Sequence, residues 1–181
     1  SGRVVGNYIA GGGYFPPGHS DAIWIGKTTG SVVIENNVID WRTPADARVA
    51  PNNAIRISGE AGNVNDVTIR NNVLLGGNYT ITVTAGATWT HTADQVGTIT
   101  NVRIYDNVID YGVTGSIDPE DRPTDLYIAH NSATTGSGVF FGSEATGAMP
   151  NLGQMSVMSG GASPSVVTSF GGAYIIGGLG S

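Results

Sequence analysis

Hydrophobic and polar positions alternate in a short pattern that recurs along the chain. Its clearest copies span residues 32–41, 67–76 and 102–111, at intervals of 35 residues. Weaker copies span residues 4–9 and 126–131. Alternation within a β-branched run predicts a strand with one buried face, and a fixed period of this length predicts a solenoid.

An asparagine interrupts the alternation in every copy. Because asparagine tolerates left-handed backbone geometry, each repeat is predicted to run as a strand, a sharp bend at this residue and a second strand. In stacked repeats the asparagines would form one column spaced ~4.8 Å apart, in which side-chain amides hydrogen-bond between repeats. The column consists of Asn7, Asn37, Asn72, Asn107 and Asn131. Glu35 and Arg70 are predicted to be exposed outward neighbours, a pair worth about 0–1 kcal/mol.

This asparagine column beside aliphatic columns resembles the right-handed parallel β-helix of the pectate-lyase-like superfamily, over roughly residues 3–142. The resemblance implies an all-β solenoid of about five coils. It also implies recognition of a polysaccharide, with cleavage by a lyase or glycoside hydrolase as a further expectation, or a phage tailspike-like role.

The end of the chain differs in composition from the repeats. Between Ser132 and Ser181 the only charged residue is Glu144, and glycines are frequent. We expect residues 1–142 to form the β-helix and residues 143–181 an irregular apolar segment that covers the last coil and mediates oligomer assembly. A self-folded cap is the alternative.

A further strand follows a loop of variable length in each repeat. It places Ile23, Ile55 and Ile81 inward, with Trp24, Arg56 and Thr82 outward. Variable loops in a solenoid gather on one side, which is usually the binding side. Aromatic and basic residues that point outward are suited to binding carbohydrate. The residues predicted to bind it are Trp24, Trp41, Arg56, Tyr105 and Tyr111.

Composition excludes several classes of function. A net charge of -6 offers no basic stripe for nucleic acid, and no apolar run reaches the ~20 residues of a membrane helix. The absence of cysteine excludes disulfides and zinc–thiolate sites. Abundant Gly, Asn, Thr and Ser suit an extracellular, cell-surface or virion protein. Ser1-Gly2 resembles a processing or cloning remnant, so we expect a piece of something longer or of an assembly.

The sharpest catalytic candidate is His19-Ser20-Asp21. Residues two apart on a strand face the same way, so Asp21 could orient His19 as a general base. Many β-helix carbohydrate enzymes look similar at this position. Alternatively, Asp21 lies in the column of Asn53 and hydrogen-bonds turn amides, with His19 a loop residue.

Asp40 and Asp110 form a second candidate pair, each followed by an aromatic residue. Two coils would separate them by about 9.6 Å, at the upper edge of the carboxylate spacing in inverting glycosidases. The alternative is that both carboxylates end a strand and accept turn hydrogen bonds, since Leu75 occupies the intermediate position.

An acidic cluster could bind calcium through oxygen ligands. It consists of Asp118, Glu120, Asp121 and Asp125. Some pectate-lyase relatives use calcium with an arginine base, and Arg122 lies within the cluster. A solvated acidic loop is the alternative, and no other cofactor is expected.

The sequence also raises two non-enzymatic functions, ice binding and a structural role. The threonines between Thr80 and Thr92 follow one another along one coil, whereas ice-binding β-helices repeat threonine from coil to coil. The remaining alternative is a structural subunit of a phage or cell-surface fibre, spike or decoration assembly.

Overall fold

The computed structural model describes residues 1–11, 20–42, 52–84, 96–110, 112–119 and 123–133, with two short strands at 169–170 and 173–174. The regular elements among these residues are strands, apart from one 3₁₀ turn, η1 (Gly59–Ala61). The described part of the chain has no helix long and apolar enough to cross a bilayer.

The strands build three parallel sheets. In spatial order, sheet A contains β1 (Gly2–Val5), β4 (Val32–Glu35), β7 (Val64–Arg70), β10 (Ile99–Tyr105) and β13 (Thr124–Ala129). Sheet B contains β14 (Ser132–Ala133), β11 (Val108–Ile109), β8 (Val73–Gly76), β5 (Val38–Trp41) and β2 (Tyr8–Ala10). Sheet C contains β12 (Gly115–Asp118), β9 (Tyr79–Thr84), β6 (Asn53–Ser58) and β3 (Asp21–Ile25). A separate antiparallel pair joins β15 (Ser169–Phe170) to β16 (Ala173–Tyr174).

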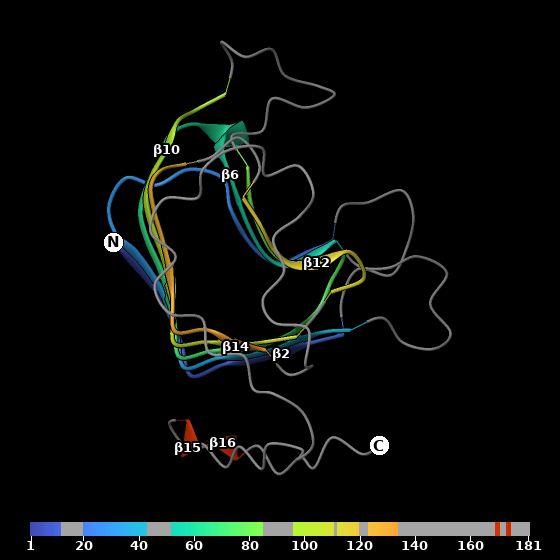
Figure 1. The fold of residues 1–181 in the computed structure, drawn as a ribbon. Coiled ribbons are helices and arrows are strands. Elements are labelled where there is room, and N and C mark those ends of the chain that lie inside the picture. The colour runs from blue at the N-terminus through green and yellow to red at the C-terminus, as the bar shows by residue number, and fades with distance from the viewer. Residues whose placement is uncertain are drawn as a thin grey trace.

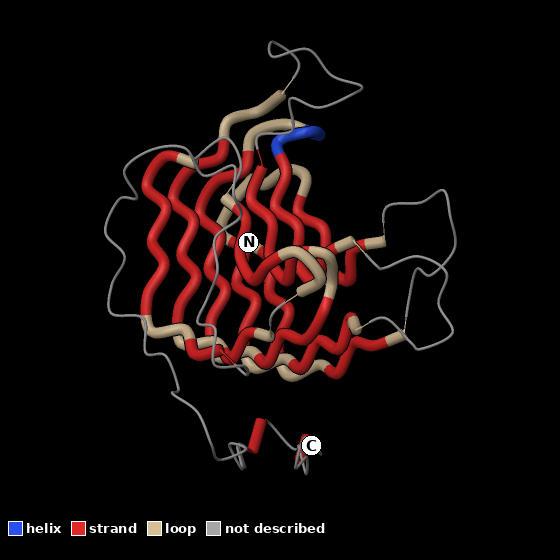
Figure 2. The backbone as a smooth tube through the Cα atoms, turned by 45° about the vertical axis from the view of Figure 1, so that its right-hand side comes forward, coloured by secondary structure: helices blue, strands red, loops and turns tan. Residues whose placement is uncertain are grey.

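The chain visits sheets A, B and C in turn, and each visit adds one strand beside its predecessor. We call each such round a repeat, so β1, β2 and β3 form repeat 1, and β13 and β14 belong to repeat 5. Figure 1 looks nearly along the stacking direction, so strands of one sheet overlie one another, and Figure 2 separates them. This all-β architecture with parallel sheets is compatible with a parallel β-helix.

The core consists of aliphatic columns that run through the repeats. On sheet A, Ile34 pairs with Ile69 and Ile69 with Ile104, and all three side chains are fully buried. Sheets B and C contribute parallel columns of the same kind. Their fully buried members are Ile39, Leu74 and Ile109 on sheet B and Ile55, Ile81 and Ile117 on sheet C. The predicted inward positions are therefore confirmed.

The sharp bend between sheets A and B is one residue earlier than predicted. The left-handed residue immediately precedes the column asparagine, with φ between 52° and 67°. These bend residues are Gly6, Asn36, Asn71, Asp106 and His130. The column asparagines themselves do not have a positive φ. Their side chains form hydrogen bonds along the stack instead.

The asparagine column forms the predicted ladder. The backbone N–H and Nδ2 of Asn37 both donate to Asn72 Oδ1, at 3.0 and 2.9 Å, and Asn72 donates in the same way to Asn107. Each Nδ2 also donates to carbonyls, as Asn72 does to Ile34 and Arg70. The buried amides are thereby satisfied, as buried polar groups must be.

A second left-handed column crosses sheet A and was not predicted. Asp66, Asn101 and Asp125 have φ of 61°, 52° and 58° and lie within β7, β10 and β13. Each lies six residues before a ladder asparagine, and Asn101 Nδ2 donates to Asp66 Oδ1 at 3.2 Å. Because the kinks stack, neighbouring strands bend together and their pairing continues on either side.

Candidate functional site

A row of interacting side chains crosses the outer face of sheet A. Glu35 accepts hydrogen bonds from Arg3 of β1 and from Arg70 Nε of β7, the latter at 2.8 Å. Glu35 and Arg70 are neighbours on adjacent repeats, as predicted. The Arg70 side chain is 40% exposed, but that of Glu35 is only 6% exposed, so the predicted exposure is wrong for Glu35. Hydrogen bonds from Arg3, and then from Arg70, lower the Glu35 pKa against the opposing effect of burial. The carboxylate therefore stays ionised at neutral pH.

The row continues onto β10 and β13. Arg70 Nη1 donates to Tyr105 Oη at 3.5 Å, and the Tyr105 and Tyr127 rings meet edge to face, with centroids 6.3 Å apart. Parallel register places Tyr105 beside Arg70, and Tyr127 beside Arg103. Polar and aromatic groups from all five strands of sheet A are thus in contact along one line.

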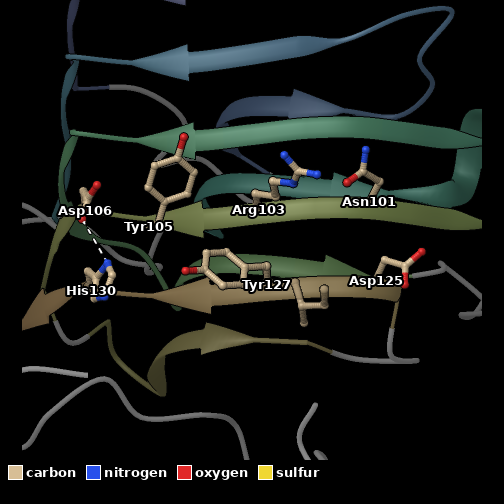
Figure 3. A pocket seen from close by; sticks show the side chains of 8 residues that line it. Asn101, Arg103, Tyr105, Asp106, Asp125, Tyr127 and His130 are labelled. Atoms are coloured by element: carbon tan, nitrogen blue, oxygen red, sulfur yellow. Dashed lines mark ion pairs between the residues drawn. The ribbon is translucent and has the colours of Figure 1, made fainter. Parts of the chain in front are cut away.

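An open groove lies over β10 and β13 at the end of this row (Figure 3). Its lining comprises Asn101, Arg103, Tyr105, Asp106, Asp125, Leu126, Tyr127 and His130. Tyr127 is 41% exposed, and Arg103 is exposed without an ion-pair partner in the described part of the chain. The groove therefore offers an aromatic pair beside an unpaired guanidinium.

The two left-handed columns set the ends of the groove. Figure 3 shows Asp106 and His130 at one end, and Asn101 and Asp125 at the other. His130 Nδ1 lies 3.7 Å from Asp106 Oδ1, and both side chains are about half exposed, at 60% and 48%. All four residues belong to the left-handed columns, and their polar side chains flank the two rings with hydrogen-bonding groups.

Sheet C carries two of the predicted carbohydrate-binding residues side by side. Trp24 is 54% exposed and in register with Arg56. Arg56 Nη2 donates to Glu60 Oε1 at 2.5 Å, and its Nη1 lies 4.0 Å from Asp21 Oδ2. The guanidinium of Arg56 is therefore engaged within the protein, unlike that of Arg103.

The structure places Asp21 in the column of Asn53, as the alternative interpretation of this residue expects. Asp21 Oδ1 accepts from the Asn53 backbone N–H at 3.1 Å and from its Nδ2 at 2.9 Å. His19 lies outside the described residues. The catalytic pairing of His19 with Asp21 stays a prediction.

Asp40 is held by its neighbour Arg42. Arg42 Nε and Nη2 donate to the two carboxylate oxygens at 2.7 and 2.5 Å, and these hydrogen bonds lower the Asp40 pKa. Asp40 pairs with Leu75, and the Asp110 N–H donates to the Leu74 carbonyl, so Leu75 lies between the two acids as expected. An ionised Asp40 fits the role of a general base in catalysis better than that of a general acid.

Trp41 is not on the surface, and its prediction as an exposed carbohydrate-binding residue is wrong. Its side chain is 6% exposed within the hydrophobic core, and its indole Nε1 donates to the Ser20 carbonyl at 2.9 Å. A buried indole needs such a partner. Thr82, expected outward, is also buried and donates to Asn53 Oδ1. Tyr111 lies outside the described residues.

The predicted calcium ligands fall on different sheets where they are described. Asp118 is buried on β12 of sheet C, whereas Asp125 is exposed on β13 of sheet A. Glu120 and Asp121 lie outside the described residues. Within the described ranges no three acidic or histidine side chains are grouped to hold a metal ion.

Of the residues that line the groove, the sequence pointed to Tyr105, as a carbohydrate-binding residue, and to Asp125, as a calcium ligand, and the others were missed. Arg103 and Tyr127 occupy outward positions of the alternating pattern in repeats 4 and 5, and that pattern was the available signal. His130 and Asp106 were missed because the bend was placed at the following asparagine.

Comparison of the chain with models of protein families, with curated proteins and with solved structures gives no match.

Proposed function

We propose that the three sheets form the coils of a right-handed parallel β-helix similar to that of the pectate-lyase-like superfamily. We propose further that the protein binds a polysaccharide along the outer face of sheet A. The cyclic strand order and the continuous asparagine ladder support the fold. The groove over β10 and β13 supports the function.

One observation carries the proposal for binding. Tyr105 and Tyr127 present ring surfaces beside Arg103, which has no ion-pair partner among the described residues, in an open groove with polar groups at both ends. Aromatic rings bury the apolar faces of sugars, while guanidinium, amide and carboxylate groups hydrogen-bond their hydroxyls. An open groove along extended strands suits a linear chain of sugars more than a compact small molecule.

Glycan binding to surface variants tests this proposal. We expect Tyr127→Ala to weaken binding to the best ligand of a polysaccharide panel by about tenfold or more, because a central aromatic contact is lost. Arg103→Ala should also weaken binding, whereas Tyr127→Phe should retain most of it. Affinities would be measured by calorimetry or biolayer interferometry.

Trp24→Ala is the matched control, because Trp24 is an exposed aromatic residue on another sheet. If Trp24→Ala abolished binding and Tyr127→Ala did not, the binding face would be that of sheet C, where Trp24 and Arg56 lie side by side. Failure to bind any polysaccharide of the panel would remove the proposal altogether.

Cleavage is a separate expectation with a separate test. If the wild type cleaves the bound glycan and His19→Ala does not, the protein is an enzyme as well as a binding protein. If the wild type binds the glycan without cleaving it, the protein recognises the polysaccharide but does not degrade it.

A structural subunit of a fibre, spike or decoration assembly outside the cytoplasm is the second candidate function. It is favoured by the composition of residues 132–181, in which Glu144 is the only charged residue and glycines are frequent, since an uncharged apolar segment suits contacts with other chains.

A further inference from the structure

The groove over β10 and β13 is longer along the strands than across them. Its lining residues all lie on these two strands or at the corner residue that follows each strand. They extend from Asn101 to Asp106 and from Asp125 to His130, which is ~17 Å at ~3.3 Å per residue, whereas the two strands are only ~4.8 Å apart. A linear ligand that fills the groove therefore runs parallel to the strands, over the length of about three linked pyranose rings.

Charge is distributed unevenly along this length. Arg103 lies near the middle of the groove, in register with Tyr127, and its exposed guanidinium has no ion-pair partner among the described residues. Exposed carboxylates lie on either side, with Asp125 at one end of the groove and Asp106 at the other (Figure 3). The groove thus has one cationic position between two anionic ones.

The other arginines described on sheet A are engaged within the protein. Arg70, on the neighbouring strand β7, donates to Glu35 and to Tyr105. Arg3, on β1, donates to the same carboxylate of Glu35. Among these arginines, Arg103 is therefore the one whose guanidinium can meet an anionic ligand.

This arrangement of charge discriminates between glycans. A guanidinium binds a carboxylate through paired, charge-assisted hydrogen bonds, and the rings of Tyr105 and Tyr127 can pack against sugar rings. An acidic sugar on either side of Arg103 would face Asp106 or Asp125, and like charges across an interface disfavour binding. One acidic sugar between two neutral sugars satisfies all three positions.

We propose that the groove selects a polysaccharide in which single acidic sugars are separated by neutral ones. The ligand lies along β10 and β13, with its acidic sugar at Arg103 and a neutral sugar towards each end. This inference rests on the proposed binding of a polysaccharide and adds the class of polysaccharide that is bound.

A binding panel with three classes of glycan tests the selection. Hyaluronan alternates an acidic with a neutral sugar, every sugar of polygalacturonate is acidic, and soluble glucans are neutral. We expect the best ligand to belong to the first class, and reduction of its carboxyl groups to weaken binding by about fivefold. Oligosaccharides of this ligand should gain affinity up to about three sugars and little beyond that length.

Variants of the charged residues identify the cause. In Arg103→Gln, carboxyl reduction of the ligand should no longer change the affinity. Lys27→Gln is the matched control, because it removes the same charge from an exposed residue outside the groove, and it should respond to reduction as the wild type does.

The carboxylates at the ends of the groove have their own variant. Asp125→Asn should bind polygalacturonate about twofold to fivefold more tightly than the wild type, because a repulsive charge is removed. The measurements are made at pH 8, where imidazoles are uncharged, because a protonated His130 would offset the charge of Asp106, 3.7 Å away.

Three results would overturn the selection while leaving polysaccharide binding intact. One is a best ligand that is neutral or acidic at every sugar. Another is a response to carboxyl reduction that is as large in Arg103→Gln as in the wild type. The third is an affinity that keeps rising well beyond three sugars, because the ligand would then run across the strands. Failure to bind any glycan of the panel removes both proposals.

Discussion

At the scale of single residues, adjacent positions at each corner have different roles. Asn71 adopts the left-handed conformation and is exposed, whereas Asn72 does not and is only 1% exposed. The first position therefore requires tolerance of positive φ, and aspartate, glycine and histidine occupy it as well. The second uses all the groups of an amide, because its Oδ1 accepts from one neighbouring repeat while its Nδ2 donates both to the next asparagine and to backbone carbonyls.

Removing a buried ladder amide should be strongly destabilising. In Asn72→Ala, the Asn37 N–H and the Ile34 carbonyl lose their partners in a buried setting. We expect the free energy of unfolding to fall by about 3 kcal/mol or more, measured by urea denaturation. Asn7→Ala at the exposed end is the control and should cost about 1 kcal/mol or less. Equal losses in the two variants would contradict the role given to burial.

At the scale of elements, Glu35 joins three strands of sheet A. It lies on β4 and accepts from Arg3 of β1 and Arg70 of β7, so one carboxylate links repeats 1, 2 and 3. The same row leads through Tyr105 to the groove. The position of the groove tyrosines thus depends on pairing across the whole sheet.

The lowered Glu35 pKa predicts a stability change in acid. A carboxyl group whose pKa is lower in the folded state stabilises the fold above its unfolded pKa, and this contribution is lost as the pH falls through the folded pKa. We expect Glu35→Gln to be less stable than the wild type at pH 7, with the difference shrinking towards about pH 3. Urea denaturation at several pH values measures it. A difference that stays constant across this range would refute the linkage.

At the scale of the whole molecule, each repeat contacts only its neighbours, so stability is set repeat by repeat. Within the described part of the chain, repeat 3 has a neighbour on both sides and a fully buried core, whereas repeat 1 pairs with repeat 2 alone and has half-buried aliphatic residues. Opening should therefore begin at repeat 1.

Hydrogen exchange of the unmodified chain would detect this gradient. We expect the amides of Val4 and Ile9 in repeat 1 to exchange faster than those of Ile69 and Leu74 in repeat 3, because fraying at the open end exposes less apolar surface. Uniform exchange rates across the repeats would indicate a single cooperative unit instead.

The sequence by itself determined the strands, their parallel stacking and the ladder. These features follow from short-range alternation and from a spacing that repeats along the chain, as with Ile34, Ile69 and Ile104. Local sequence could not separate the bend residue from the ladder asparagine, because Asn36-Asn37 and Asn71-Asn72 offer two chemically identical side chains.

Only the tertiary structure decided which outward positions are buried and which groups meet. Trp41 is covered because the Ser20 carbonyl lies against its indole, and Glu35 is enclosed because arginines of two other repeats reach it. Tyr127 lies beside Arg103 because two strands 24 residues apart pair in register. Burial and contact of this kind depend on neighbours distant in the chain, and a pattern of nearby residues does not encode them.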